Sequence, residues 1–272
     1  MVRIASSGIK QKRRKRLLII AGIIFGILVV LFLLSLWFSN TAWLKIASVS
    51  VSGENVVPAS SIEAVVTDNI SGRYFGMFSR ANIFFYPKDK IENDLHTLYP
   101  TLGDTNIHAL DLHTLSVTVV ERTPYALWCG NGAATSSGGC VLLDEKGLAY
   151  AYAPEFSGHV YEMYIGALPE GPLPKQFLTP TSFHSLSALV ETFSKKIAPD
   201  VIVKVVIDEN NDVHLVSSGG YEIKFSLADE TGAVFQRFTL TLTADPFTTH
   251  PLSDFEYIDL RFGDKVYYKL KS

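Results

Sequence analysis

The chain has 272 residues and a formal net charge of −3, but its charges are unevenly distributed. Seven of the 24 basic residues precede residue 17, which leaves 17 basic against 27 acidic residues, a balance of −10, in the rest of the chain. This acidic remainder argues against a nucleic-acid-binding surface, and its length of about 230 residues is enough for one large or two small domains.

The first predicted element is a transmembrane helix over residues 17–38. These 22 residues contain no charged side chain, and 17 of them are Leu, Ile, Val or Phe. A helix of this length reaches about 33 Å, enough to cross a hydrocarbon core of about 30 Å. The apolar residues favour insertion by about 7 kcal/mol, whereas one central Lys would oppose it by only about 3 kcal/mol.

Residues 1–16 form a basic tail, which the positive-inside rule places in the cytoplasm. The first acidic residue is Glu54, so the C-terminal part is expected outside the cytoplasm. A cleaved signal peptide is the alternative, but its shorter apolar region ends in an Ala-x-Ala-like site, which this segment lacks. Trp37 and Trp43 instead suit an interfacial aromatic belt. The tail is expected to bind anionic lipid, and nucleic-acid binding is the less favoured alternative.

The region after the membrane predicts the element order β-α-α-β-β. Alternating apolar and Ser residues over 47–52 predict a strand, and apolar residues at helical spacing predict helices that begin at Pro58 and Pro87. Residues 72–82 are expected to form a loop. Two further strands are expected near 105–112 and 115–122, with His113 and Thr114 at or near the turn between them.

Three segments of this region, VSVSGENVVPASSI, NIFFYPKDKIENDLHTLYP and LSVTVVERTPYALW, resemble the POTRA domain of the FtsQ/DivIB family of bacterial division proteins. The resemblance implies a POTRA domain over residues 43–122. In that family a Glu-Arg-x-Pro motif closes the last strand, and Glu121, Arg122 and Pro124 match it here. Read on its own, Pro124 is a simple strand terminator, and in both readings it marks the exit from the first domain.

The two cysteines, Cys129 and Cys140, bracket a Gly-, Ser- and Ala-rich loop over residues 130–139. In an oxidising compartment we expect a local disulfide, which would stabilise the fold by up to about 3 kcal/mol. Two unpaired thiols are the alternative. A zinc site is disfavoured because no His lies nearby.

Residues 123–272 predict a strand-rich second domain. Strands are expected over 141–143, 148–152, 202–208, 212–217, 221–226, 255–262 and 266–270, helices over 182–197 and 230–241, and an irregular stretch over 167–174. This pattern resembles the β domain of the FtsQ/DivIB family, and the closing YIDLRFGDKVYYKL is its most specific match. The predicted fold class is therefore a single transmembrane helix plus an α+β ectodomain, with a POTRA domain followed by a strand-rich domain that one or two helices cover.

No catalytic or metal-binding motif stands out in the sequence. The seven His are dispersed, and neither an H-E-x-x-H nor a G-x-S-x-G pattern occurs. Asp208, Asn210 and Asp212 resemble the start of a calcium loop, but Val213 and Gly219 occupy its sixth and twelfth places, so a hairpin turn is favoured. We expect no enzymatic activity, no cofactor and no small-molecule substrate.

The last predicted hairpin is the candidate binding site. A loop over residues 263–265 would pair Phe262 with Val266 and Leu260 with Tyr268, and it is favoured because it keeps the apolar residues on one face. A two-residue loop is the alternative, and Gly263 is not at the usual left-handed position of a longer loop. If the last strand lies at a sheet edge, its backbone can accept a strand from another chain. Protection of that edge by its lysines is the alternative.

The resemblance implies that this region binds FtsB, called DivIC in other bacteria, by strand addition. The residues matched by motif are Tyr257, Arg261, Phe262, Val266, Tyr267 and Lys269. Arg261 and Lys269 are expected to meet acidic groups of the partner.

We therefore expect a non-enzymatic, single-pass scaffold in the bacterial cytoplasmic membrane, enriched at the division septum. It would hold FtsB- and FtsL-like partners and regulate septal peptidoglycan synthesis, with the POTRA domain contributing recruitment. A POTRA-bearing module of protein translocation or outer-membrane assembly is the alternative, although neither repeated units nor barrel-like segments are visible. A membrane-tethered wall enzyme or sensor is a third reading.

Overall fold

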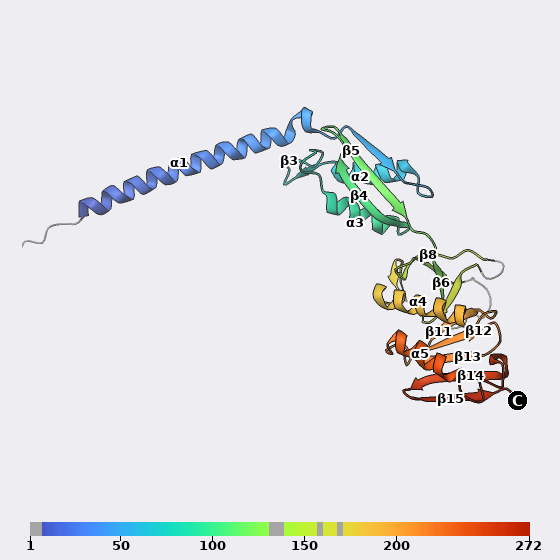
Figure 1. Ribbon diagram of the computed structural model, residues 1–272. Coiled ribbons are helices and arrows are strands. Elements are labelled where there is room, and N and C mark those ends of the chain that lie inside the picture. Colours follow the sequence, from blue (N-terminus) through green and yellow to red (C-terminus); the bar gives the residue numbers. More distant parts are fainter. Residues whose placement is uncertain (1–6, 131–138, 157–159, 168–170) are drawn as a thin grey trace, which may run out of the picture. The chain divides into compact units, whose positions relative to one another are not determined.

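The computed structural model describes residues 7–130, 139–156, 160–167 and 171–272 (Figure 1). The chain divides into two compact units, Met1–Glu121 and Arg122–Ser272, which we call unit 1 and unit 2. A single apolar helix near the N-terminus is followed by a strand-rich mixture of helices and strands, which confirms this coarse part of the predicted fold class.

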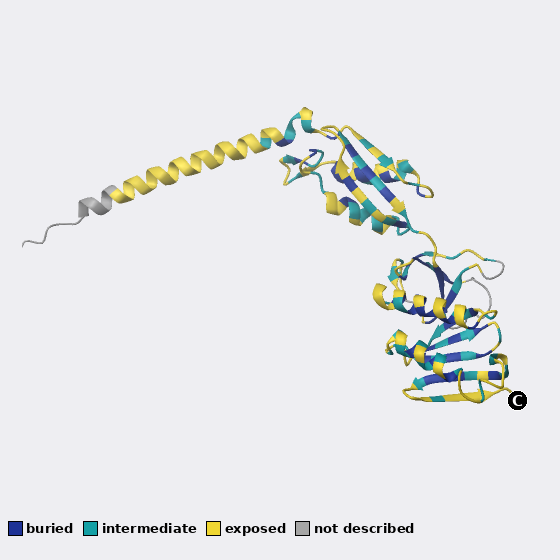
Figure 2. Cartoon of the chain, in the orientation of Figure 1, coloured by how far each residue is buried: buried dark blue, intermediate teal, exposed yellow. Residues whose placement is uncertain are grey.

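Helix α1 (Ser7–Asn40) contains the predicted span and extends beyond it at both ends. Its part from Arg13 to Asn40 is long and apolar enough to cross a membrane by length and composition, and a window of 18 residues within it has a mean hydropathy of 3.3. Figure 2 shows most of this helix exposed, and residues 13–35 are all exposed. A helix that is apolar all round needs an apolar environment, and the described part of the chain leaves residues 13–35 of this helix uncovered.

Unit 1 forms a three-stranded sheet with two helices. The elements are β1 (Ser48–Ser52), α2 (Ala59–Ile70), α3 (Lys88–Leu98), β4 (Leu102–Ala109) and β5 (Thr114–Glu121), with a short turn η1 (Ala42–Leu44) before β1. The strand order is β1-β5-β4, with β1 parallel and β4 antiparallel to β5. Ile62 and Val66 of α2 and Ile91 and Leu95 of α3 are buried in one core with the inward residues of β5. Helical spacing on the helices and alternation on β5 together build this core.

Three expectations for unit 1 need correction. Pro58 and Pro87 precede their helices at the N-cap and are not the first helical residues. The predicted loop over 72–82 contains a small hairpin, β2 (Arg73–Tyr74) and β3 (Phe78–Ser79). Strand β4 ends at Ala109, three residues before the predicted end, because the apolar residues that follow it lie exposed in the β4–β5 turn.

Unit 2 contains one mixed ten-stranded sheet in the order β10-β8-β7-β6-β9-β11-β12-β13-β14-β15. The strands are β6 (Ala126–Cys129), β7 (Val141–Leu143), β8 (Leu148–Tyr152), β9 (Glu162–Ile165), β10 (Lys175–Gln176), β11 (Ile202–Ile207), β12 (Asp212–Ser217), β13 (Glu222–Ser226), β14 (Phe255–Phe262) and β15 (Lys265–Leu270). Helices α4 (Pro180–Lys196) and α5 (Thr231–Thr241) and the turn η2 (Leu252–Asp254) complete the unit. Strands β6, β9 and β10 were not expected from the sequence.

The two faces of this sheet differ. Both helices bury aromatic residues, Phe193 of α4 and Phe238 of α5, in one core with the inward residues of β12, β13 and β14. On β6, β7 and β9 a second, smaller apolar cluster includes both cysteines. The outward residues of β12 and β13 are half buried, and all of them except Val216 are polar. The C-terminal strands thus have a helix-covered apolar face and a polar face, as the alternation of their residues predicts.

Candidate functional site at the edge strand

Strand β15 is the last strand of the ten-stranded sheet and hydrogen-bonds only to β14 within it. The opposite edge, β10, is a two-residue strand, and Gln176 there donates from Nε2 to the carbonyl oxygens of Lys146 and Leu178. Very short strands are a common way to close a sheet edge against other chains. The six-residue β15 therefore offers the longer open edge of this sheet.

The predicted register of the last hairpin is wrong. Phe262 pairs with Lys265, so the loop has two residues, Gly263 and Asp264. Gly263 has φ = +64°, which matches the first central position of a type II′ turn, where glycine is favoured. The pairing then shifts between Asp259 and Phe262, so that Asp259 lies opposite Tyr267. The expectation that the apolar face is continuous failed because this irregularity lies in β14.

The shift turns Phe262 away from the core. It was expected beside Ile258 and Leu260, but those two are fully buried while Phe262 is 54% exposed. Its ring instead meets Tyr267, itself 52% exposed, edge to face at a centroid distance of 5.0 Å. Two of the predicted contact residues thus form an exposed aromatic pair beside the loop.

Arg261 is committed to groups within the chain. Its Nε donates to Oδ1 of Asp259 over 2.8 Å, and its Nη1 donates to Oδ2 of Asp212 over 2.6 Å. Burial would raise the pKa of Asp259, but the hydrogen bonds and charge of Arg261 outweigh it and hold that pKa below its usual range. The same hydrogen bond to Asp259 and the one to Asp212 stabilise the charged guanidinium and raise the pKa of Arg261. Arg261 therefore fastens β14 to β12, and the predicted ion pair with a partner would compete with these bonds.

The other predicted residues lie on both sides of the strand. Val266 is half buried and packs against the core. Tyr257 lies on the polar face, where the Lys224 ammonium is 4.7 Å from its ring centroid. Lys269 pairs with Glu256 over 2.6 Å, but both side chains are more than half exposed, so this bridge contributes little.

Two residues outside the predicted set also shape the edge. Tyr268, expected on the core face, is 44% exposed and packs edge to face on Phe247 and Phe255, which stack at 4.5 Å. Lys271 bonds back to the carbonyl oxygens of Ser253 and Gly219, so it does not guard the edge as the alternative reading supposed. The dense aromatic composition of YIDLRFGDKVYYKL was the only sequence signal for Tyr268.

Charged residues on the outward face of β12 and β13 form a small network with Asp208 of the β11–β12 turn. His214 lies 3.4 Å from Glu222 and 3.6 Å from Asp208, and Glu222 lies 3.2 Å from Lys224. The hydrogen bond that His214 donates to the carboxylate of Glu222 raises the pKa of His214 despite its partial burial. The same bond, with help from Lys224, lowers the pKa of Glu222 to about 2. Asp208 accepts backbone hydrogen bonds from Asn210 and Asp212, as expected for a hairpin turn.

The junction residues act within separate units. One carboxylate oxygen of Glu121 accepts hydrogen bonds from the backbone of Asn55, Val56 and Val57 at 2.7–2.9 Å, closing the β1–α2 loop of unit 1. In unit 2, Arg122 pairs with the buried carboxylate of Asp144 over 2.5 Å. Pro124 is exposed and precedes β6.

Cys129 and Cys140 are joined by a disulfide at a Cα–Cα distance of 4.2 Å, and both are buried. The bond connects the end of β6 to the residue before β7 and packs in the smaller apolar cluster with Leu127 and Met163. Most of the predicted loop that it closes, residues 131–138, lies outside the described residues.

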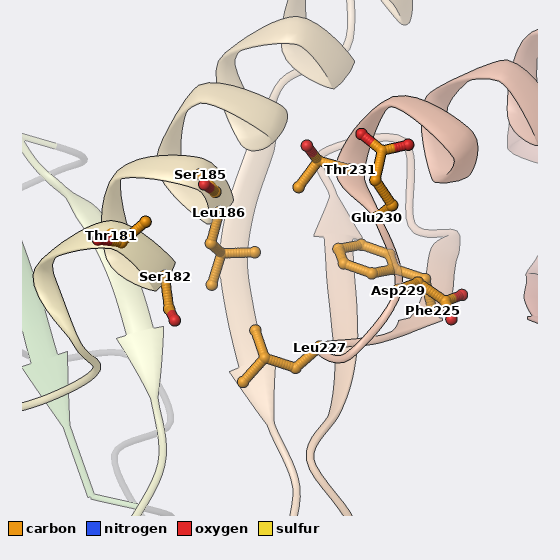
Figure 3. Close-up of a pocket in the computed structure, with 9 residues that line it drawn as sticks. All are labelled: Thr181, Ser182, Ser185, Leu186, Phe225, Leu227, Asp229, Glu230 and Thr231. Atoms are coloured by element: carbon orange, nitrogen blue, oxygen red, sulfur yellow. The ribbon is translucent and has the colours of Figure 1, made fainter.

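A pocket of unit 2 lies between the first turns of α4 and α5 and has a volume of about 340 Å³ (Figure 3). Its acidic side chains are already engaged, because Glu230 caps α5 and Asp229 pairs with Arg237 over 2.6 Å. Among the described residues, no group of three or more His, Cys, Asp or Glu is placed to hold a metal ion. The pocket therefore offers hydroxyl groups but no free catalytic pair.

No protein-family model matches this chain, and no curated protein matches it by sequence.

Proposed function

We propose that this chain is a non-enzymatic, single-pass membrane scaffold of the FtsQ/DivIB type. In this proposal α1 anchors it in the bacterial cytoplasmic membrane with the N-terminus in the cytoplasm, and unit 2 binds FtsB/DivIC- and FtsL-like bitopic partners at the septum. Through them it regulates septal peptidoglycan synthesis. The observation that carries the proposal is the open, aromatic-rich edge strand β15 at the C-terminal end of a ten-stranded sheet.

The element order of unit 1 supports its assignment as a POTRA domain. A strand, two helices and two strands occur in the order that the family resemblance implies, with the small β2–β3 hairpin between the helices. The parallel pairing of β1 with β5 brings the first and last strands of the unit together, so the chain returns to its starting strand before it enters unit 2.

The composition of β15 supports strand addition. Six residues in a regular strand can give main-chain hydrogen bonds to a partner strand, and alternate side chains can give specificity. Phe262, Tyr267 and Leu270 are exposed and offer apolar surface that a partner can bury. Burial of this surface would add to the free energy of binding that the main-chain hydrogen bonds supply.

Paired proline substitutions in β15 test this proposal. Successive amide groups of a strand point to opposite sides, so one of Tyr267 and Tyr268 donates toward β14 and the other toward the open edge. Of the variants Tyr267→Pro and Tyr268→Pro, one therefore removes the N–H group that faces β14, and the other removes the N–H group that faces the open edge. The readouts are thermal unfolding of unit 2 and co-purification of the full chain with the FtsB/DivIC-like protein of the same organism.

We expect the variant with the better-preserved unfolding temperature to co-purify with at least tenfold less partner than the wild type. Tyr152→Ala, which removes a Tyr that is 74% exposed on β8, is the matched control and should bind normally. If both proline variants retain the partner, the edge is not the binding site. Depletion of the protein tests the cellular role, since filamentous cells support a division function and loss of outer-membrane proteins supports the assembly alternative.

A further inference from the structure

Unit 1 exposes large apolar side chains at the end where α1 enters it. They come from η1, the β2–β3 turn, the segment before α3 and the β4–β5 turn. We call six of them the apolar rim: Trp43, Phe75, Met77, Phe84, Phe85 and Leu112. Phe75 is 92% exposed and Trp43 is 82% exposed, so these side chains contribute almost nothing to the core of unit 1. Exposed apolar groups gathered at one end of a unit indicate an interaction surface.

The rim is continuous with the C-terminal end of α1. Phe84 stacks on Phe38 at 6.2 Å, and Asn40 donates to the carbonyl oxygen of Met77 over 2.9 Å. Leu112 and Trp43 line one apolar pocket of about 410 Å³ together with Phe38. Figure 1 shows the β2–β3 hairpin beside this end of the helix.

The hairpin also reaches back along the apolar part of α1. Phe78 of β3 meets Phe32 edge to face at a centroid distance of 6.0 Å. Phe32 precedes Phe38 by six residues, which is about 9 Å along a helix. If the apolar segment of α1 spans the hydrocarbon core, the hairpin cannot stand clear of the membrane and must lie at the depth of its interface.

The hairpin is built to tolerate that environment. Strand β2 pairs with β3, the backbone N–H of Met77 donates to the carbonyl oxygen of Tyr74 over 2.9 Å, and the backbone N–H of Ser79 donates to the Ser39 hydroxyl over 3.0 Å. Backbone that enters an apolar layer must have such internal partners. Lys45 and Arg73 are exposed and can reach lipid phosphates, as cations at membrane interfaces commonly do.

We propose that the apolar rim is embedded in the interfacial layer of the membrane that α1 crosses, on its C-terminal side. Unit 1 then rests on the membrane surface instead of moving freely on a tether. The occupant is lipid, because the rim is continuous with the membrane-crossing helix and overlaps its last turns. This inference rests on the membrane anchor of the proposed function, but it does not depend on partner binding at β15.

Site-specific fluorescence can test whether the apolar rim contacts lipid, water or another protein. The full chain is reconstituted in phosphatidylcholine–phosphatidylglycerol vesicles with a nitrobenzoxadiazole label at Phe75→Cys, Val56→Cys or Leu31→Cys. Labelling without reductant leaves the native disulfide unreacted. Val56 is an exposed apolar residue in the loop that Glu121 closes, at the other end of the eight-residue β5, about 23 Å along the strand. Nitroxide lipids report contact with lipid, and dithionite reports contact with water.

We expect the label at position 75 to be quenched by nitroxide lipid, as at position 31, and to react with dithionite at least tenfold more slowly than the label at position 56. If positions 75 and 56 both react rapidly while position 31 stays lipid-quenched, the anchor holds and the rim proposal fails. Protection at position 75 without lipid quenching would indicate a protein partner or a second copy and would also overturn it. A label at position 31 that reacts with dithionite would overturn the anchor itself.

Discussion

The exposed aromatic residues of the two units differ in their backbone setting. In unit 1, outside α1, they lie in turns, whereas the exposed residues of the edge strands β1 and β4 of its sheet are Ser, Asp, Asn, His and Ala. In unit 2 three of them, Phe262, Tyr267 and Tyr268, gather in the β14–β15 hairpin, and β15 is an open edge strand with unpaired backbone groups. A turn offers apolar area without a row of hydrogen bonds, which suits a fluid lipid layer. An edge strand offers both, which suits a peptide strand of defined register.

The units also differ in how charged side chains stabilise them. Unit 1 uses one carboxylate, Glu121, to gather three backbone N–H groups. Unit 2 uses ion pairs between side chains, above all those of Arg261 with Asp259 on the same strand and with Asp212 on β12. Substitutions at these positions should therefore affect one unit and spare the other, which hydrogen exchange can follow peptide by peptide in the full chain.

The largest expected effect is on the disulfide of unit 2. Reduction of Cys129–Cys140 should lower the free energy of unfolding of unit 2 by about 3 kcal/mol, because the bond closes a short loop in the unfolded chain. Thermal unfolding with and without reductant measures it. In the double variant Cys129→Ala, Cys140→Ala, the free energy of unfolding of unit 2 should equal that of the reduced wild type and should not change when reductant is added. An equal response of unit 1 would contradict the separation of the two units.

Arg261→Ala should lower the stability of unit 2 by about 2 kcal/mol. Removing one partner of a fully buried ion pair costs roughly 3–5 kcal/mol. The cost is smaller here because 30% of the Arg261 side chain is exposed. The cost arises because Asp259, which is only 5% exposed, keeps its charge without a partner. Lys269→Ala is the control, and loss of its exposed bridge to Glu256 should have little effect. Equal stability of both variants would show that Arg261 does not hold β14.

Glu121→Ala should destabilise unit 1 by about 1.5 kcal/mol at neutral pH, since the backbone donors of residues 55–57 lose their acceptor. Burial would raise the pKa of Glu121, but these three hydrogen bonds outweigh it and lower that pKa. A lowered pKa means that the contribution is complete above the ordinary Glu value and is lost as the pH falls through the lowered one. The difference from wild type should therefore shrink in acid. Glu63→Ala, at an exposed position of α2, should change neither the stability of unit 1 at neutral pH nor its dependence on pH.

The smallest expected effect is the pH response of His214. Its pKa is raised by Glu222, so its contribution to unit 2 is complete below the ordinary His value and is lost as the pH rises through the raised one. Asp208 and Lys224 also face this ring and respectively support and oppose its charge. From pH 6 to pH 8, wild type should lose more stability than His214→Gln. His184→Gln, at an exposed position of α4, should retain the wild-type slope.

Long periodic elements could be predicted from the sequence. The apolar run in α1 and the helical spacing in α4 located both helices, and β14 has the predicted bounds. Strands β6 and β9 were missed because each has only four residues, mostly buried, without the alternation that identifies a strand. The end of β4 was misplaced because Leu110 and Leu112 look like strand residues yet lie exposed.

The candidate site could be predicted only in part. Its location in the last hairpin followed from the alternating apolar residues and from the family resemblance. The orientation of Phe262 and the engagement of Arg261 could not be predicted, because both depend on the irregularity in β14 and on Asp212, which is 49 residues away in the sequence. Such long-range pairs leave no local pattern.

Hydrogen exchange at β15 tests the central claim most directly. The full chain in lipid nanodiscs is compared with and without its FtsB/DivIC-like partner. We predict that alternate amides of β15, those facing the open edge, exchange at least tenfold more slowly in the complex, while β10 at the opposite edge is unchanged. A stable complex in which β15 exchanges as in the free protein would contradict strand addition at this edge.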